Sequence, residues 1–458
     1  MPSKVKIIET SKSFSSEGLI RCRDSLYSYL QSLNKSVGIV RYDGASALTK
    51  ELSKEFVRFV EQSQNNNQNT TSAGTKKSTA NIYIFDRRCD AITPLLQQWT
   101  YRAMLHELLT ISRGQIDLSQ VPNIESDMQK IVLDPDIDTF YADNMNLNYG
   151  DVSANAQELI KKFQKEKSSQ QKIDSIADMK AFLERYPAFK QLQSMTSKHL
   201  TLISELQKRV NSNKLMKISE YEQNLVTSGA SLSVQDLAEV LKDGNVKNED
   251  CIRLCSLYAA RVLHDENAQK ILDIPVLKSR SIRAECMRVV HQMKRYQRMN
   301  KEQFLGPWGF GANGPSILDD FRGKDFSGGL KRITDAVNNS LANNTSSLME
   351  NTENIYTQHK PAVIYLLDLI RQSDGNVTQL DLLNRTFPVE EFEGSGDGNG
   401  GSTKDIVIFM VGGWTFEESL AIYKFNRENQ GRFRCTLAGT ECLNSSIFMA
   451  NINKVTSG

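Results

Sequence analysis

Two carboxylates flank the end of a predicted strand, at a position where α/β proteins often carry out catalysis. Asp86 closes the apolar run NIYIFD (81–86), and Asp90 follows four residues later. Carboxylates at the carboxyl end of a parallel strand are well placed for acid–base chemistry. Arg87 and Arg88 lie beside them, however, and the sequence contains no second carboxylate cluster. We therefore favour structural ion pairs or capping over catalysis at these positions.

Glycines occur in patterns that could hold phosphates. GFGANG (309–314) and GDGNGG (396–401) both match the dinucleotide fingerprint G-x-G-x-x-G. That site needs a strand before the glycines and a helix after them, whereas these segments follow a basic helical segment and a polar loop. Gly412 and Gly413 do lie between a predicted strand and helix. Because the other glycines and a P-loop lysine are missing there, a tight β–α turn is the preferred interpretation, and a nucleotide-dependent enzyme is the alternative.

The histidines and cysteines form no catalytic or metal-binding pattern. None of the five histidines belongs to an H-E-x-x-H sequence, and no G-x-S-x-G elbow marks a serine nucleophile. Of the seven cysteines only Cys251 and Cys255 are close, and an i, i+4 pair without further ligands is a poor zinc site. We expect thiols in a reducing compartment. The sequence predicts no catalytic residue, metal site or cofactor, and hence not an enzyme.

One predicted helix is strongly basic. Its cations could bind phosphates or lipid headgroups, but they are spread around the helix and lack the interleaved aromatic residues that stack on bases. The whole chain carries a net charge of only +2, so nucleic acid is not an expected partner. A solvated face, or one that meets an acidic partner, is the preferred interpretation. The cations are Lys278, Arg280, Arg283, Arg288, Lys294, Arg295 and Arg298.

The elements that position these residues change in type along the chain. Both ends alternate apolar strands with helices, and neither end has enough strands for a stable sheet. We therefore predict an α/β plus all-α fold: a Rossmann-like parallel-sheet domain, from residues 1–115 and 355–458, split by a mainly helical insertion domain at 116–354. The polar run 61–80 is predicted to be a disordered loop. Strands are expected at 37–42, 81–86, 405–411 and 433–439, and helices at 19–34, 46–62, 95–109, 154–168, 175–226, 232–242, 249–264 and 277–299.

Two helix starts have specific signals. Thr93 followed by Pro94 predicts the N-terminus of the helix over 95–109. Thr415 and Glu418 have the spacing of a capping box, which predicts the start of a helix after the strand at 405–411.

Residues 178–210 form a long helical pattern with Pro187 inside it. Proline in a helix interior removes one backbone donor and costs about 3 kcal/mol, so this helix could be bent in one state and continuous in another. An apolar stripe follows the proline, and Leu200 and Ile203 lie off it. Such off-stripe residues face a second core neighbour more often than a partner, but surplus apolar surface suits helix–helix binding. The stripe comprises Leu192, Met195, His199, Leu202 and Leu206.

Nine segments, in order along nearly the whole chain, resemble the SM family, the Sec-one/Munc-eighteen-like proteins that bind syntaxins. Residues 81–109 carry its aspartate–arginine strand end, its Thr-Pro-Leu-Leu sequence and its T-Y-x-A-M motif. The density of matches suggests the vacuolar-protein-sorting forty-five branch. The other segments are 116–124, 140–152, 175–189, 197–206, 220–225, 253–262, 354–361 and 407–427.

The resemblance implies a scaffold that binds a syntaxin-type SNARE and assembled SNARE bundles, without catalysis. It implies promotion of SNARE-complex assembly in trans-Golgi, endosomal or vacuolar transport by a cytoplasmic monomer, attached peripherally to Golgi or endosomal membranes through SNAREs. In this family a helical hairpin contacts SNARE helices. Pro187 matches the proline that bends the hairpin and Leu200 matches a contact leucine; nearby candidates are Tyr186, Phe189, Lys190 and His199.

One departure from the family pattern concerns the start of the chain. SM proteins normally begin with a further α/β domain before the segment that matches near Val5, and that domain holds the pocket for the syntaxin N-terminal peptide. We therefore expect N-peptide binding to be absent and hairpin contacts to be the principal binding mode. The alternative is a degenerate or truncated SM paralogue.

Overall fold

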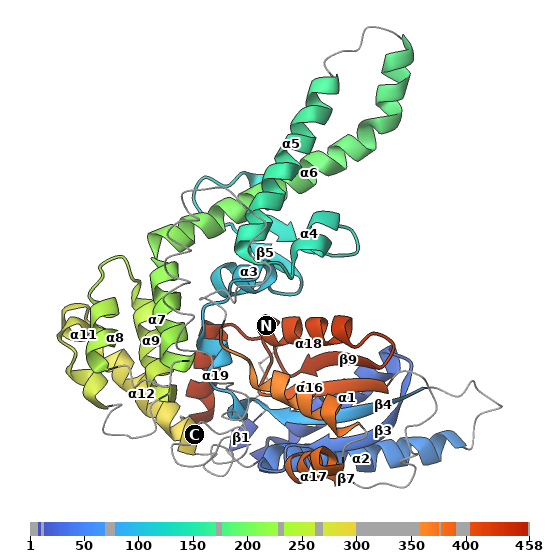
Figure 1. Cartoon of the computed structure of the whole chain (residues 1–458), viewed down its shortest axis with the longest axis vertical. Coiled ribbons are helices and arrows are strands. Elements are labelled where there is room, and N and C mark those ends of the chain that lie inside the picture. The colour runs from blue at the N-terminus through green and yellow to red at the C-terminus, as the bar shows by residue number, and fades with distance from the viewer. Residues whose placement is uncertain are drawn as a thin grey trace. The chain divides into compact units, whose positions relative to one another are not determined.

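The computed structural model of the chain contains two compact units (Figure 1). The sheet unit comprises Met1–Leu95, Gln223–Ala238 and Asn248–Gly458, and the hairpin unit comprises Leu96–Glu222 and Glu239–Lys247. The structure describes residues 8–10, 13–68, 78–170, 176–227, 233–261, 269–298, 358–374, 377–390 and 404–456. Both G-x-G-x-x-G matches and the predicted boundary at 354/355 lie outside these residues.

The sheet unit is built on five strands in the order β7-β3-β4-β8-β9. The four longer strands are parallel, and β7 pairs antiparallel with β3 at the edge. Strand β4 lies directly beside β8, with Ala80 opposite Asp405 and Asp86 opposite Val411. The two ends of the sequence therefore form one sheet, which confirms the predicted split α/β fold. The strands are β3 (Lys35–Tyr42), β4 (Ser78–Asp86), β7 (Val389–Glu390), β8 (Lys404–Val411) and β9 (Phe433–Gly439).

Apolar side chains on both faces of the central strands explain why the sheet is covered twice. On β4, Ile82 and Ile84 belong to one core, whereas Tyr83 and Phe85 belong to the core on the opposite face. Burial of one such side chain contributes roughly 1.5–3 kcal/mol. Helices α1 (Ser16–Ser32) and α2 (Ala47–Gln68) cover the first face, and α16 (Ala362–Ser373), α17 (Val377–Thr386) and α18 (Phe416–Glu428) cover the second.

Further helices of the sheet unit pack beside the sheet. Helix α12 (Arg283–Arg298) contacts both α9 (Asn248–Arg261) and α19 (Ser445–Thr456). The short α11 (Pro275–Ser279) precedes α12, and a small β1–β2 hairpin (Ile8–Thr10 and Ser13–Phe14) lies near the N-terminus.

The hairpin unit is dominated by two long helices that run side by side, α5 (Tyr149–Gln170) and α6 (Ile176–Ser212) (Figure 1). The C-terminal half of α6 contacts α3 (Tyr101–Leu109). The remaining elements are the two-stranded ladder β5 (Gln115–Asp117) and β6 (Lys130–Val132), the short α4 (Thr139–Asn144), and parts of α7 (Leu215–Thr227) and α8 (Val234–Leu241).

The helix predicted over 95–109 is wrong in its first half. A 3₁₀ turn covers Thr93–Leu95, and α3 begins only at Tyr101. The Thr93 hydroxyl donates to Asp90 (2.6 Å) instead of capping a helix. Residues 96–100 are buried and bind elsewhere: the Gln97 amide donates to Glu222 (2.8 Å) and the Trp99 indole to Ser219 (2.6 Å). These tertiary partners outweigh local helix signals.

Two stretches that were each predicted as one helix are divided in the structure near a residue with left-handed backbone. The stretch 175–226 is two helices, α6 and α7, separated near Lys214 (φ 55°). The stretch 277–299 is likewise two, separated at Ser281 (φ 59°). The loop predicted at 61–80 is wrong at both of its ends, since α2 continues to Gln68 and β4 begins at Ser78, and residues 69–77 lie outside the described residues. The predicted capping box is confirmed: the Thr415 hydroxyl and the Glu418 carboxylate each accept the other's backbone N–H.

Candidate functional site

Helix α6 has an anchored C-terminal half and, before it, an exposed segment. From Leu192 onward one side of the helix is buried in the hairpin unit, whereas Arg185, Tyr186, Pro187 and Ala188 are exposed. This segment therefore presents side chains at the surface. The buried side comprises Leu192, Thr196, His199, Leu202, Ile203, Leu206 and Val210.

Pro187 lies inside α6 without ending it. Since proline has no backbone N–H, the carbonyl of residue 183 lacks its usual helical donor. The helix is continuous through this weak point. Its exposure means that the ring contributes no core packing.

The three other candidates near the proline have different roles. The Lys190 ammonium lies 5.4 Å from the centre of the Tyr186 ring, and Tyr186 is 39% exposed, so this pair faces outward. The half-buried Phe189 instead stacks on Phe163 of α5, with ring centres 5.6 Å apart and planes inclined by 16°. Phe189 therefore joins the two helices of the hairpin.

His199 is an anchor of the hairpin and not a surface residue. It is fully buried, its Nδ1 lies 2.8 Å from the Tyr101 hydroxyl, and its Nε2 lies 2.9 Å from Asp138 Oδ2. Asp138 also caps α4 by accepting the Tyr141 N–H (2.9 Å), and it pairs with Lys198. Helices α3, α4 and α6 thus meet at one imidazole. A direct SNARE contact by His199 does not fit this burial, and we correct that expectation.

The electrostatics of the anchor favour a neutral imidazole beside an ionised carboxylate. Burial lowers the pKa of His199, although Asp138 opposes that shift. Burial also works against ionisation of Asp138, but hydrogen bonds from His199 and Lys198 hold the pKa of its carboxyl well below the usual range. In the neutral form His199 donates from Nε2 to Asp138 and accepts the Tyr101 O–H at Nδ1.

The off-stripe residues on α6 divide between core and surface. Ile203 is buried, as the core interpretation predicts, whereas Leu200 is only half-buried. Leu200 therefore keeps apolar surface on the flank of the anchored half.

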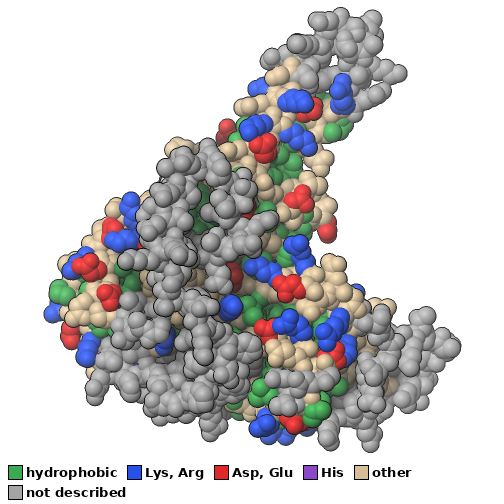
Figure 2. Space-filling model, viewed as in Figure 1, with side chains coloured by type: hydrophobic (Ala, Val, Ile, Leu, Met, Phe, Trp, Pro, Cys, Tyr) green, Lys and Arg blue, Asp and Glu red, His purple; other side chains and the backbone are tan. Residues whose placement is uncertain are grey.

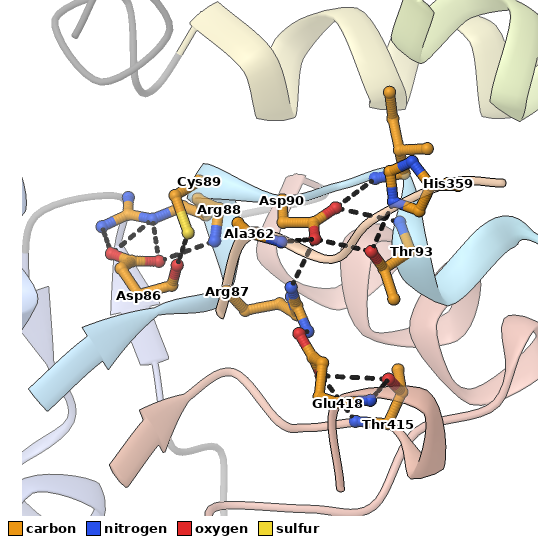
Figure 3. Close-up of polar contacts among 11 residues, drawn as sticks. Asp86, Arg87, Arg88, Cys89, Asp90, Thr93, His359, Ala362, Thr415 and Glu418 are labelled. Atoms are coloured by element: carbon orange, nitrogen blue, oxygen red, sulfur yellow. Dashed lines mark hydrogen bonds and ion pairs between the residues drawn. The ribbon is translucent and has the colours of Figure 1, made fainter. Parts of the chain in front are cut away.

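The carboxylates at the end of β4 lie in a buried network of ion pairs (Figure 3). Arg88 pairs with Asp86 at 2.5 Å, and Arg87 pairs with Glu418 of α18 at 2.6 Å and with Asp90 at 3.6 Å. All five side chains are at most 5% exposed.

Backbone groups complete the network. Asp90 accepts the Thr93 N–H (2.9 Å) and the Ala362 N–H (3.0 Å), and Glu418 accepts the Thr415 N–H (2.7 Å). The network thus ties together the end of β4, the start of α16 and the start of α18. We refer to Asp86, Arg87, Arg88, Asp90 and Glu418 as the clasp.

Ion pairing and burial together determine whether these carboxyl groups are ionised. Burial works against ionisation of Asp86 and Asp90, but Arg88 and Arg87, respectively, keep the pKa of each carboxyl below its ordinary value. Burial raises the pKa of Glu418 despite Arg87. The predicted structural role of the Asp86–Asp90 segment is confirmed. Glu418 was foreseen only as a capping residue, because nothing in the local sequence indicates its distant arginine.

The glycine pair after β8 is a tight turn, as predicted. Gly412 and Gly413 have φ of 95° and 103°, a region that favours glycine. A Cβ on Gly412 would lie 2.8 Å from the Arg87 Cβ, and a Cβ on Gly413 would lie 2.9 Å from the Glu441 carbonyl oxygen. The glycines make room for the clasp and for the neighbouring backbone.

Within the described residues, no group of three or more His, Cys, Asp or Glu side chains could hold a metal ion. The seven cysteines are all free thiols. None of the helices that the structure describes is long and apolar enough to cross a membrane.

Comparison with known proteins identifies the family. The model of the Sec1 family matches residues 4–451, which is almost the whole chain. The chain belongs to the Sec1 family. Vacuolar protein sorting-associated protein 45 of Rattus norvegicus is 33% identical over 95% of this chain and 69% of its own length. The Saccharomyces cerevisiae protein of that name is 29% identical over 96% of this chain and 71% of its own length. These similarities place the chain in the same branch of the family.

Solved structures agree with this assignment. The "SM Protein Vps45 in Complex with Qa SNARE Tlg2" matches all of this chain and 73% of that chain with a TM-score of 0.78 and 28% identity. The Unc18–syntaxin 1 complex from Monosiga brevicollis has a TM-score of 0.63 and 17% identity, over 96% of this chain and 72% of that chain, so it supports the fold alone.

Proposed function

We propose that this Sec1-family protein binds a syntaxin-type SNARE, and assembled SNARE bundles, through the hairpin α5–α6. By holding these helices it promotes SNARE-complex assembly in trans-Golgi, endosomal or vacuolar transport. Support comes from the similar Vps45 structures, two of which are complexes with the Qa SNARE Tlg2. We further propose a cytoplasmic monomer that is held on Golgi or endosomal membranes through its SNARE partners.

The observation that carries this proposal is the exposed segment of α6 at 185–188, together with Lys190. The anchored half of α6 fixes the direction of the helix through His199, and the exposed segment presents Tyr186 and Lys190 outward. A SNARE is an amphipathic helix, and such helices bind along the exposed face of another helix or helix pair. Leu200 supplies apolar surface on the flank of α6.

The six candidate residues then divide into contacts and supports. Tyr186, Lys190 and Leu200 are the proposed direct contacts. Pro187 is the proposed bend, Phe189 holds α6 to α5, and His199 holds α6 to its base. We thus propose that SNARE binding needs all six residues, and that only three of them contact the SNARE.

We also propose that the protein catalyses no reaction. The carboxylates at the carboxyl end of the sheet, where α/β enzymes place reactive groups, already accept hydrogen bonds from arginines and backbone N–H groups. Each is buried, so none is available to a substrate.

A pull-down with the cytosolic part of a Qa SNARE tests the binding proposal. The full chain should retain the SNARE, and Leu200→Arg should retain at least about tenfold less, because a buried interfacial charge without a partner typically costs more than 1.4 kcal/mol. Met216→Arg is the matched control, since Met216 is a 40% exposed apolar residue on α7 of the same unit.

The possible results distinguish an error in the proposed function from an error in the proposed binding site. Absence of binding by the unmodified chain contradicts the proposed function. If the unmodified chain binds, but Leu200→Arg and the double variant Tyr186→Ala/Lys190→Glu both bind equally well, the assignment to the hairpin is wrong. Thermal unfolding of each variant excludes loss of the fold as the cause.

A further inference from the structure

Helices α11 and α12 carry a concentration of positive charge that the SNARE-binding role does not use. Residues 275–298 contain seven Lys or Arg and a single Glu, whereas the whole chain balances 56 Lys and Arg against 54 Asp and Glu. An excess of this size within two consecutive helices creates a local positive potential.

Helix α12 has an inner side, which packs on α9 and α19, and an exposed outer side. On the inner side, Cys286 lies in hydrogen-bonding contact with Cys255 of α9, and the Tyr296 ring lies 6.0 Å from that of Phe448 of α19. Val289, Val290 and Met293 are buried on the same side. The outer side is exposed and, with Lys278 of the preceding α11, forms what we call the basic face: Lys278, Arg283, Met287, Arg288, His291 and Arg295.

The basic face is a broad sector on the outer side of α12. Arg283, Met287, His291 and Arg295 are spaced four residues apart, and each such step turns by about 40° around a helix of 3.6 residues per turn, so these side chains spread over about 120° of the helix surface. Twelve residues at 1.5 Å each extend the sector over roughly 18 Å along the helix. Such a sector can approach a flat surface, because it lies on the outer side of a helix and not in a groove.

The contacts of Arg283 and Arg288 leave both of these charges largely in place. The Arg283 Nε donates to the carbonyl oxygen of Leu272 (2.9 Å), which is an uncharged partner. Arg288 pairs with Glu285 at 3.1 Å, but both side chains are 49% exposed, and a pair this open to solvent is weak. Glu285 is the only acidic residue of α11 and α12.

We propose that the basic face docks this protein directly onto anionic membrane, in addition to its attachment through SNAREs. Lipid phosphates and carboxylates attract a cationic helix face without requiring directional contacts. Met287, which is 42% exposed among the cations, supplies an apolar side chain that enters the headgroup region, as in other interfacial helices. An acidic protein is the less favoured occupant, because specific protein interfaces centre on buried apolar anchors and this face has one methionine.

Flotation of the purified full chain with vesicles tests the proposal. Vesicles of equal parts phosphatidylcholine and phosphatidylserine should carry the protein upward, and vesicles of phosphatidylcholine alone should not. Reversal of two charges, Arg283→Glu/Arg288→Glu, should lower binding by at least about tenfold at low salt. Met287→Ser should lower it several-fold, and added salt should weaken binding of the unmodified chain.

A matched double variant on another helix controls for charge alone. Lys161→Glu/Lys165→Glu changes two exposed lysines of α5 and should leave vesicle binding unchanged. The proposal is overturned if the unmodified chain ignores anionic vesicles, if the Arg283/Arg288 variant floats as well as the unmodified chain, or if both double variants lose binding equally. SNARE pull-down by the Arg283/Arg288 variant should remain intact, so failure here is distinguishable from failure of the proposed function.

Discussion

The guanidinium of Arg87 and the carboxylate of Glu418 lie 2.6 Å apart, although 331 residues separate them along the chain. Both side chains are at most 1% exposed. Arg87 follows a strand from the first part of the sequence, and Glu418 lies in the first turn of a helix from the last part. This pair therefore links the two ends of the sequence within the sheet unit.

Replacement of Arg87 should destabilise the sheet unit strongly. In Arg87→Met the buried acids Glu418 and Asp90 lose their shared cation, and removal of one partner of a buried ion pair typically costs about 3–5 kcal/mol. Urea unfolding measures the loss. Arg434→Met is the control, because Arg434 also pairs with a carboxylate (2.6 Å to Asp405) but is 59% exposed, so its loss should cost at most about 1 kcal/mol.

A double variant distinguishes loss of the Arg87–Glu418 interaction from a general loss of stability. Arg87→Met/Glu418→Met should be less destabilised than the sum of the single changes, since it leaves no uncompensated Glu418. Strict additivity would show that Arg87 and Glu418 do not stabilise each other.

Acid should destabilise the hairpin unit in two steps. Because burial lowers the pKa of His199 in the folded protein, the unfolded chain binds more protons, and stability falls as the pH drops below the unfolded value of about 6.5. The lowered pKa of Asp138 has the same sign, and its contribution is lost below an unfolded value of about 3.9.

His199→Gln isolates the first step. The variant should unfold more easily at neutral pH, but its stability should vary less with pH from about 6.5 downward than that of the unmodified chain. His291→Gln, on the exposed face of α12, controls for the loss of a histidine outside this anchor. Part of the slope should remain in every variant, because burial also lowers the pKa of His359. An unchanged slope in His199→Gln would contradict the neutral-anchor description.

The stack of Phe163 on Phe189 should hold the hairpin together. Phe189→Ala and Phe163→Ala should each speed amide hydrogen exchange in α5 and in the exposed segment of α6, and each should weaken SNARE retention without removing a proposed contact. In a double-mutant cycle the two rings should show a coupling of about 0.5–1.5 kcal/mol. If the two substitutions have strictly additive effects on amide hydrogen exchange, or if the effect is confined to one helix, the two rings act separately.

Local sequence patterns determined the features that depend on near neighbours. The two-faced apolar strands, the Thr415–Glu418 capping box and the position of Pro187 within a helical pattern follow from side-chain periodicity and from hydrogen bonds that span three residues. The ordered SM-like segments predicted the family for the same reason, because each is a contiguous stretch whose residue types are legible without coordinates.

Only the tertiary structure decided which side chains are surface and which are core. Ile203 and Leu200 both lie off the apolar stripe of α6, yet Ile203 is buried and Leu200 is half-buried. The pattern cannot distinguish these two residues, because the elements that pack on α6 determine which of them is covered.

Distant partners likewise override local signals, as where Trp99 and Gln97 hold an extended segment in place of the predicted helix start. The Arg87–Glu418 ion pair shows the same effect of a distant partner over a larger separation in the sequence. A charge pattern shows that two residues can pair, but burial in a common core, which removes competing water, determines that they do.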